Sequence, residues 1–165
     1  MRKQVYLDTS SLVKRYISET GSQVLDSIYE RSEAGELRIA FSIWNMGEAI
    51  GVFDRYHEKK ILTDAEYKQA QTNLMSESLK MSRLDALIVH PITASAIAES
   101  WTLVVKHHIY EADALQISTC KEVGCNLFLG ADKRLITVAS AEEMKALNVE
   151  SEQDEALNEI LNASG

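Results

Sequence analysis

Four acidic side chains in this sequence have positions that would allow them to act together. The first of them directly follows a short segment, residues 5–7, and the last comes just after another, residues 126–129; both segments have the pattern of buried strands. The other two lie within segments of helical periodicity. If these elements meet at one edge of a sheet, the four carboxylates converge. The four acids are Asp8, Glu48, Asp113 and Asp132.

Three of these acids also have simpler explanations as helix-end residues. Asp8 and Asp132 each precede a predicted helix, where an aspartate N-cap contributes about 0.5–2 kcal/mol. Asp113 falls in the first turn of its helix, where the helix dipole favours an acid by about 0.3–1 kcal/mol. A capping role alone is therefore an open alternative for Asp8 and Asp132, and a favourable interaction with the helix dipole is the alternative for Asp113.

Glu48 carries the strongest independent argument for a functional acid. It lies inside a predicted helix, with Trp44 and Val52 one turn away on either side and no lysine or arginine at helical spacing. An acid on an apolar stretch suffers a desolvation cost unless a positive charge, such as a metal ion, compensates it. Asp113 also lacks a cation at helical spacing. The alternative for Glu48 is a position at the helix edge that reaches water.

Four converging carboxylates predict a metal-dependent reaction, because like charges repel unless a hard cation lies among them. Ligands that are all oxygen select Mg²⁺ or Mn²⁺ rather than zinc, and such an ion activates water and stabilises phosphate charge. Hydrolysis of a phosphodiester is the natural use. Asp8 would be the central ligand, with Asp113 and Asp132 completing the metal shell. Glu48 would hold a metal ion or orient the attacking water.

The elements that must position these acids alternate along the chain. Strands are predicted at residues 5–7, 37–41, 86–89, 126–129 and 147–149. Helices are predicted over residues 9–17, 22–34 and 111–123, and after Ser42, Thr63, Thr93 and Asp132. This alternation predicts an α/β fold with a mostly parallel central sheet of four to five short strands flanked by helices. Function in such sheets usually lies beyond the carboxyl ends of the strands.

Composition and segment boundaries indicate one domain. The chain has 165 residues with 45% hydrophobic content, and no obvious linker precedes residue 150. We expect a domain over residues 1–150 and an acidic tail over residues 151–165 that forms a short amphipathic helix. No apolar stretch approaches the about 20 residues of a membrane span, and no leader pattern is visible, which predicts a cytoplasmic location. Cys120 and Cys125 suit neither a disulfide framework nor a zinc site.

The charge balance limits how the chain can contact nucleic acid. With 25 acidic and 17 basic residues, the net charge of −8 is a poor match to a long stretch of RNA or DNA. Lys14 and Arg15 follow the first acid, and Lys133 and Arg134 follow the fourth, so either pair could contact a phosphate or lie on a solvated helix face. Ser10, two residues after the first acid, is a candidate supporting hydroxyl.

Four segments around the acids resemble the sequence blocks of PIN-domain ribonucleases. The segments are YLDTSSLVKRY (6–16), SIWNMGEAI (42–50), YEADALQIS (110–118) and LFLGADKRL (127–135). They span most of the chain and keep the acid order Asp, Glu, Asp, Asp. The resemblance implies a Mg²⁺- or Mn²⁺-dependent endoribonuclease that frequently forms a homodimer. It is closest to the VapC-type toxins of toxin–antitoxin operons, which implies a small DNA-binding antitoxin as partner.

The sequence departs from this family pattern at Gly130. Many members carry Ser or Thr two residues before the fourth acid, and loss of that hydroxyl could weaken the support around the metal ligands. Together with the acidic charge, this keeps a second hypothesis open: a PIN-like module with weak or no catalysis that binds RNA or a protein partner. Metal binding at the four acids separates the two, because a binding module has no need of magnesium there.

Overall fold

A parallel β-sheet lies at the centre of the computed structural model, which describes residues 2–162. Its strands are β1 (Lys3–Leu7), β2 (Leu37–Ser42), β3 (Leu87–His90), β4 (Leu127–Gly130) and β5 (Ala146–Asn148). They follow the order β3-β2-β1-β4-β5, and every neighbouring pair is parallel. The predicted α/β fold with a parallel sheet is confirmed, and Asp8 directly follows its middle strand.

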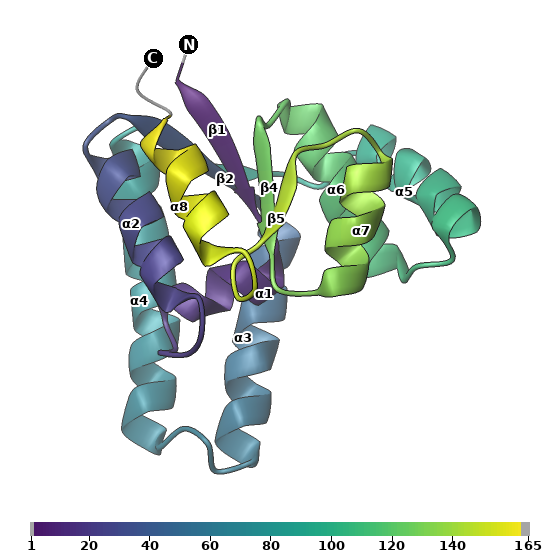
Figure 1. Ribbon diagram of the computed structural model, residues 1–165. Helices are drawn as coiled ribbons and strands as arrows, with labels where there is room; N and C mark the ends of the chain where they lie inside the picture. Colours follow the sequence, from purple (N-terminus) through teal and green to yellow (C-terminus); the bar gives the residue numbers. More distant parts are fainter. Residues whose placement is uncertain (1, 163–165) are drawn as a thin grey trace.

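Helices cover both faces of the sheet (Figure 1). The helices are α1 (Thr9–Leu12), followed by the 3₁₀ turn η1 (Val13–Arg15), α2 (Ser22–Glu33), α3 (Ile43–Glu58), α4 (Asp64–Arg83), α5 (Ala94–His107), α6 (Glu111–Val123), α7 (Lys133–Ala141) and α8 (Gln153–Leu161). Side chains alternate along a strand, so Val5 and Leu7 pack with α2, α4 and α8, whereas Tyr6 packs with α6 and α7. Two apolar cores therefore hold the sheet between them.

Several helix ends follow directly from local sequence. Ser42 caps α3, Thr63 and Glu66 form a capping box at the start of α4, and Gly124 ends α6 with a φ of 72°. The predicted helix over residues 9–17 is shorter, because it tightens into the 3₁₀ turn after its first turn. These ends fix where α3 and α6, the carriers of two candidate acids, begin.

The acidic tail forms the predicted helix, α8, which packs against α2 and β5. Ala156 and Ile160 are buried in the same core as β1, and Glu159 forms an ion pair with Lys3 at 2.9 Å. Residues 163–165 of the predicted tail lie outside the described residues. The described part of the tail is thus integrated into the fold.

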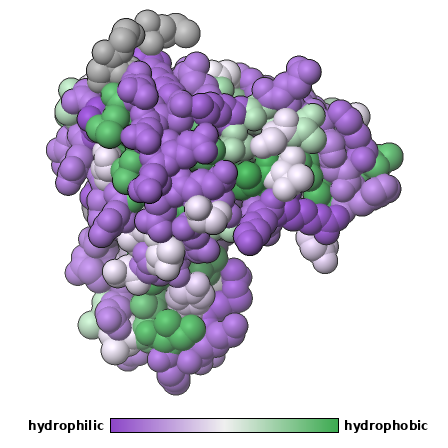
Figure 2. Space-filling view, viewed as in Figure 1, coloured by the Kyte–Doolittle hydropathy of each residue, from purple (hydrophilic) through white to green (hydrophobic). Residues whose placement is uncertain are grey.

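An arm formed by α3 and α4 extends away from the sheet (Figure 1). Figure 2 shows a mainly hydrophilic face with a hydrophobic patch toward the end of this arm. Ile61, in the connection between the two helices, is exposed. Among the helices described, none combines the length and hydropathy of a membrane span.

Candidate active site

Asp8 is buried where β1 ends, and it is the N-cap of α1. Only 2% of the residue is exposed. One carboxylate oxygen accepts a hydrogen bond from the backbone N–H of Ser11 at 2.7 Å, and the Ser10 hydroxyl donates to the same carboxylate at 2.7–2.8 Å. Burial raises the pKa of Asp8 to about 6, and the nearby charge of Asp113 also raises it. Asp8 is therefore both a helix cap and a destabilised buried charge.

Gly130 and Ser10 hold the Asp8 carboxylate against the end of β4. A Cβ atom at position 130 would lie 2.7 Å from Oδ2 of Asp8, so any other residue would require the carboxylate to move. The Ser10 hydroxyl, which donates to Asp8, also accepts a hydrogen bond from the backbone N–H of Ala131 at 2.7 Å. Gly130 thus leaves space for the Asp8 carboxylate, a steric role that the comparison with the family's sequence pattern did not predict.

Glu48 lies on the second turn of α3 and is partly exposed. Its Oε2 atom accepts hydrogen bonds from the Thr9 hydroxyl at 2.5 Å and from the side-chain amide of Gln116 at 3.3 Å. Glu48 therefore has no compensating lysine, arginine or histidine among the described residues. Neutral donors from α1 and α6 hold this acid instead.

Asp113 and Asp132 complete the set of interacting acids. Burial raises the pKa of Asp113, the charges of Asp132 and Glu48 raise it further, and the charge of Arg134 opposes them. Asp132 is exposed and caps α7, where it accepts hydrogen bonds from the backbone N–H groups of Arg134 and Leu135 at 2.8 and 3.1 Å. Capping roles and mutual electrostatic interaction therefore coexist at this edge of the sheet.

The chemistry of these four acids fits a hard divalent cation. Within residues 2–162, none of the four forms an ion pair with a lysine, arginine or histidine. In the same part of the chain, no three His, Cys, Asp or Glu side chains converge as ligands of a single ion. An ion here could therefore be bound directly by at most two of these acids, as in Mg²⁺ sites that retain several waters.

Comparison with known proteins identifies the family. The sequence matches the PIN domain family over residues 5–141. The chain belongs to this family. Membership of the PIN domain family supports hydrolytic nuclease activity in general terms. No match was found among curated proteins.

Solved structures share the fold of this PIN domain at low sequence identity. PAE2754 from Pyrobaculum aerophilum is 15% identical with a TM-score of 0.61, over 96% of this chain and 98% of its own. VapC20 of Mycobacterium tuberculosis, described as a Sarcin-Ricin loop cleaving toxin, is 15% identical with a TM-score of 0.59, over 85% and 95%. FitAB bound to the IR36 DNA fragment is 16% identical with a TM-score of 0.59, over 88% and 94%.

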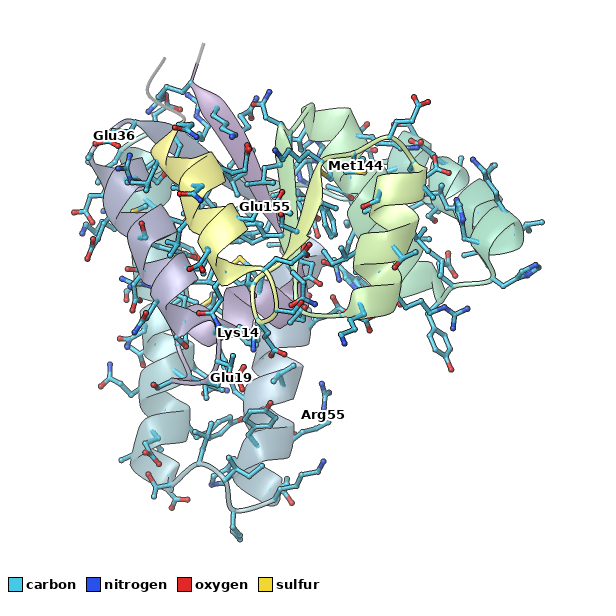
Figure 3. All side chains as sticks on the ribbon, viewed as in Figure 1. Lys14, Glu19, Glu36, Arg55, Met144 and Glu155 are labelled. Atoms are coloured by element: carbon cyan, nitrogen blue, oxygen red, sulfur yellow. The ribbon has the colours of Figure 1, made fainter. Side chains whose placement is uncertain are left out.

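The two basic pairs considered as phosphate contacts have different surroundings in this PIN domain. Lys14 is buried and pairs with Glu19 at 3.0 Å and Glu150 at 2.6 Å, as Figure 3 shows for Lys14 and Glu19. Arg15 pairs with Asp26 at 2.6 Å and Glu77 at 2.8 Å. Both charges are thus compensated within the protein.

Lys133 and Arg134 are exposed in the first turn of α7, directly after Asp132. Arg134 donates a hydrogen bond to the backbone carbonyl of His108, and its charge acts on Asp113. This pair therefore keeps positive charge next to the acids.

Sequence reasoning missed a group of buried polar residues and a groove. Thr9, Asn45 and Gln116 are buried and hydrogen-bonded to one another behind Glu48. An amide residue in the otherwise apolar stretch after Asp113 was the available signal for Gln116. Beside Glu48, a groove of about 560 Å³ follows α3. Its lining comprises Thr9, Ile43, Trp44, Gly47, Glu48, Gly51, Val52 and Arg55.

Proposed function

We propose that this PIN domain is a Mg²⁺- or Mn²⁺-dependent endoribonuclease that hydrolyses RNA phosphodiester bonds. The observation that carries the proposal is the buried carboxylate of Asp8, whose pKa is raised by burial and by Asp113. Asp113 in turn interacts with Asp132 and Glu48. Nearby acids whose charges raise the pKa of Asp8 and Asp113, with no compensating ion pair among the described residues, are explained by a bound cation.

Each acid has a separate role in this proposal. Asp8, Asp113 and Asp132 would hold the metal either directly or through its bound waters, and the ion when bound would supply an activated water and stabilise charge on the phosphate. Glu48 orients the attacking water through Oε1, because Oε2 already accepts two hydrogen bonds. Ser10 keeps the Asp8 carboxylate in place through its hydrogen bond.

The groove along α3 supports a single-stranded RNA substrate. Trp44 is 46% exposed beside Glu48, and Arg55 projects outward from the same helix (Figure 3). Single-stranded nucleic acid is typically bound by stacking on aromatic side chains together with nearby positive charge. Lys133 and Arg134 would contact the phosphate on the other side of the acids.

The sequence blocks shared with VapC-type toxins support a toxin of a toxin–antitoxin pair, with a small DNA-binding antitoxin as partner and a cytoplasmic location. VapC20, which shares the fold, is described as a toxin that cleaves the Sarcin-Ricin loop. We expect a short gene for a DNA-binding protein next to the gene of this chain. Co-expression of the two products should yield a complex in which RNA cleavage is suppressed, and an uninhibited enzyme would contradict the pairing.

Exposed apolar side chains support a homodimer. Trp101 and Val105 on α5 and Tyr110 before α6 are 59%, 74% and 81% exposed. Such side chains are more typical of an interface than of a solvated helix face. Light scattering should give the mass of a dimer for the wild type and that of a monomer for Val105→Lys; a monomeric wild type would contradict the proposal.

Cleavage of defined RNAs by purified protein tests the nuclease. Wild-type protein should cut single-stranded or structured RNA with Mg²⁺ or Mn²⁺ and lose this activity in EDTA, whereas Asp8→Asn should be inactive in both. Cleavage that persists in Asp8→Asn would exclude these acids as the site. RNA binding without metal-dependent cleavage would favour the second candidate, a non-catalytic binding module. That candidate is supported by the absence, within residues 2–162, of three converging metal ligands.

A further inference from the structure

Three buried polar residues from separate parts of the chain form a hydrogen-bonded group behind Glu48, and two of them, Thr9 and Gln116, donate to its carboxylate. We propose that Thr9, Asn45 and Gln116, here called the Glu48 clamp, are positioning residues that hold Glu48 in its working orientation. The inference rests on the proposed nuclease function and adds residues that the four-acid pattern does not contain.

Contacts to a single oxygen define what the clamp does to Glu48. The hydroxyl of Thr9 and the Nε2 group of Gln116 both donate to Oε2, at 2.5 and 3.3 Å. Among the described residues, no protein group donates to Oε1. The clamp therefore restrains the side chain through one oxygen and leaves the other free to contact a water or a metal ion.

The orientation of the Gln116 amide follows from its other hydrogen bonds. Its Oε1 atom accepts from the backbone N–H of Thr9 at 3.0 Å and from Nδ2 of Asn45 at 2.7 Å. A carbonyl oxygen that accepts two donors cannot exchange places with the NH₂ group without losing both bonds. Nε2 is therefore the group that faces Glu48.

Asn45 fixes the clamp to the sheet. It is fully buried, and its Nδ2 group donates to Gln116 and to the Thr9 hydroxyl, the latter at 3.1 Å. Its Oδ1 atom accepts from the hydroxyl of Tyr6 at 3.1 Å and from the backbone N–H of Ser42 at 2.8 Å. Both ends of the amide are thus satisfied, and a buried polar network of this kind specifies one arrangement.

The positions of the clamp residues link the elements that carry three of the acids. Thr9 is next to Asp8 in the chain, Asn45 lies one turn before Glu48 on α3, and Gln116 lies one turn after Asp113 on α6. Burial of polar groups costs free energy that an apolar core would not require. This cost is explained if the buried polar residues serve to fix the position of Glu48 relative to the other acids.

Steady-state cleavage by four variants tests this role. Thr9→Val and Gln116→Leu should lower kcat by about 10- to 100-fold with little change in KM, because support around a site typically carries that factor. Thr9→Ser keeps the hydroxyl and should restore kcat. Thr119→Val makes the same change in the buried part of α6, where the hydroxyl contacts only the carbonyl of Leu115, and should leave kcat unchanged.

Two further measurements separate positioning from general destabilisation. In a Glu48→Gln background, Thr9→Val should lower kcat no further, since both changes act on the same group. NMR of protein with labelled glutamate should report one side-chain rotamer for Glu48 in the wild type and averaging in Thr9→Val. This readout needs no activity, so a wild type that fails to cleave RNA refutes the nuclease while the NMR result still decides the clamp. Unchanged rotamers, or equal losses in Thr9→Val and Thr119→Val, would overturn the inference.

Discussion

The carboxylate of Asp8 lies so close to Gly130 that a Cβ atom at this position would displace it. The two residues follow or end neighbouring strands, β1 and β4, and a Cβ at position 130 would be 2.7 Å from Oδ2. This contact places the central acid at the edge of the sheet, where the other three acids act on it or on each other.

Gly130→Ser should lower RNA cleavage by about 100-fold, because displacement of a reacting group by about 1 Å can cost that much. A serine would restore the hydroxyl common in the family, so the missing-hydroxyl explanation predicts a gain instead. Rates of cleavage at saturating Mg²⁺, with circular dichroism to confirm folding, decide between them. A Gly130→Ser enzyme that is as active as the wild type would show that Asp8 can adjust.

Ser10→Ala should shift the acidic limb of the pH–rate profile to higher pH. The Ser10 hydrogen bond lowers the pKa of Asp8, so its loss raises that pKa further, and Asp8 must be ionised to hold a metal. Measurement of kcat/KM between pH 5 and pH 8 gives the midpoint of the limb, with Ser10→Thr as the variant that keeps the hydroxyl. Identical profiles for wild type and Ser10→Ala would contradict this role.

Asp8→Asn should make the metal-free protein more stable at neutral pH. The folded-state pKa of Asp8 is raised from 3.8 to about 6, so the stability it contributes is present below pH 3.8 and lost as the pH rises through about 6. Such a shift corresponds to roughly 3 kcal/mol at pH 7 as an order of magnitude. Urea unfolding in EDTA should show a gain that disappears near pH 4.

Added Mg²⁺ should reverse the order of stability of these two proteins. A ligand that binds only the folded state raises its stability, so the melting temperature of the wild type should rise and that of Asp8→Asn should not. Equal rises in both proteins would argue against a metal at Asp8.

Lys133→Ala and Arg134→Ala should weaken RNA binding and reduce its dependence on salt. Each phosphate contact with a single strand contributes about 0.7 to the slope of log affinity against log salt concentration. Lys14→Ala should instead lower the melting temperature, because Lys14 is buried between Glu19 and Glu150. Fluorescence titrations of inactive protein at several salt concentrations give the slopes. A larger salt effect for Lys14→Ala would reverse the assignment.

Local sequence was sufficient for the order of elements and for the ends of several helices. The capping residues Ser42 and Thr63 and the terminating Gly124 act through bonds within their own turns, so their roles can be read without tertiary contacts. The same holds for Asp8 and Asp132, whose places after strands follow from hydrophobic periodicity. The four acids and the α/β fold were therefore accessible from sequence.

Tertiary structure alone decided how these acids are supported and which cations remain available. Lys14 donates a hydrogen bond to Glu150, which is 136 residues away in the sequence. The side chain of Gln116 accepts a hydrogen bond from the backbone N–H of Thr9, which is 107 residues away. Contacts over such separations depend on which strands become neighbours, which periodicity does not encode. The sequence by itself thus determined which residues could do the chemistry. The pairing of β4 with β1 and the hydrogen bonds between side chains of α6 and α3 decided how Asp8 and Glu48 are held.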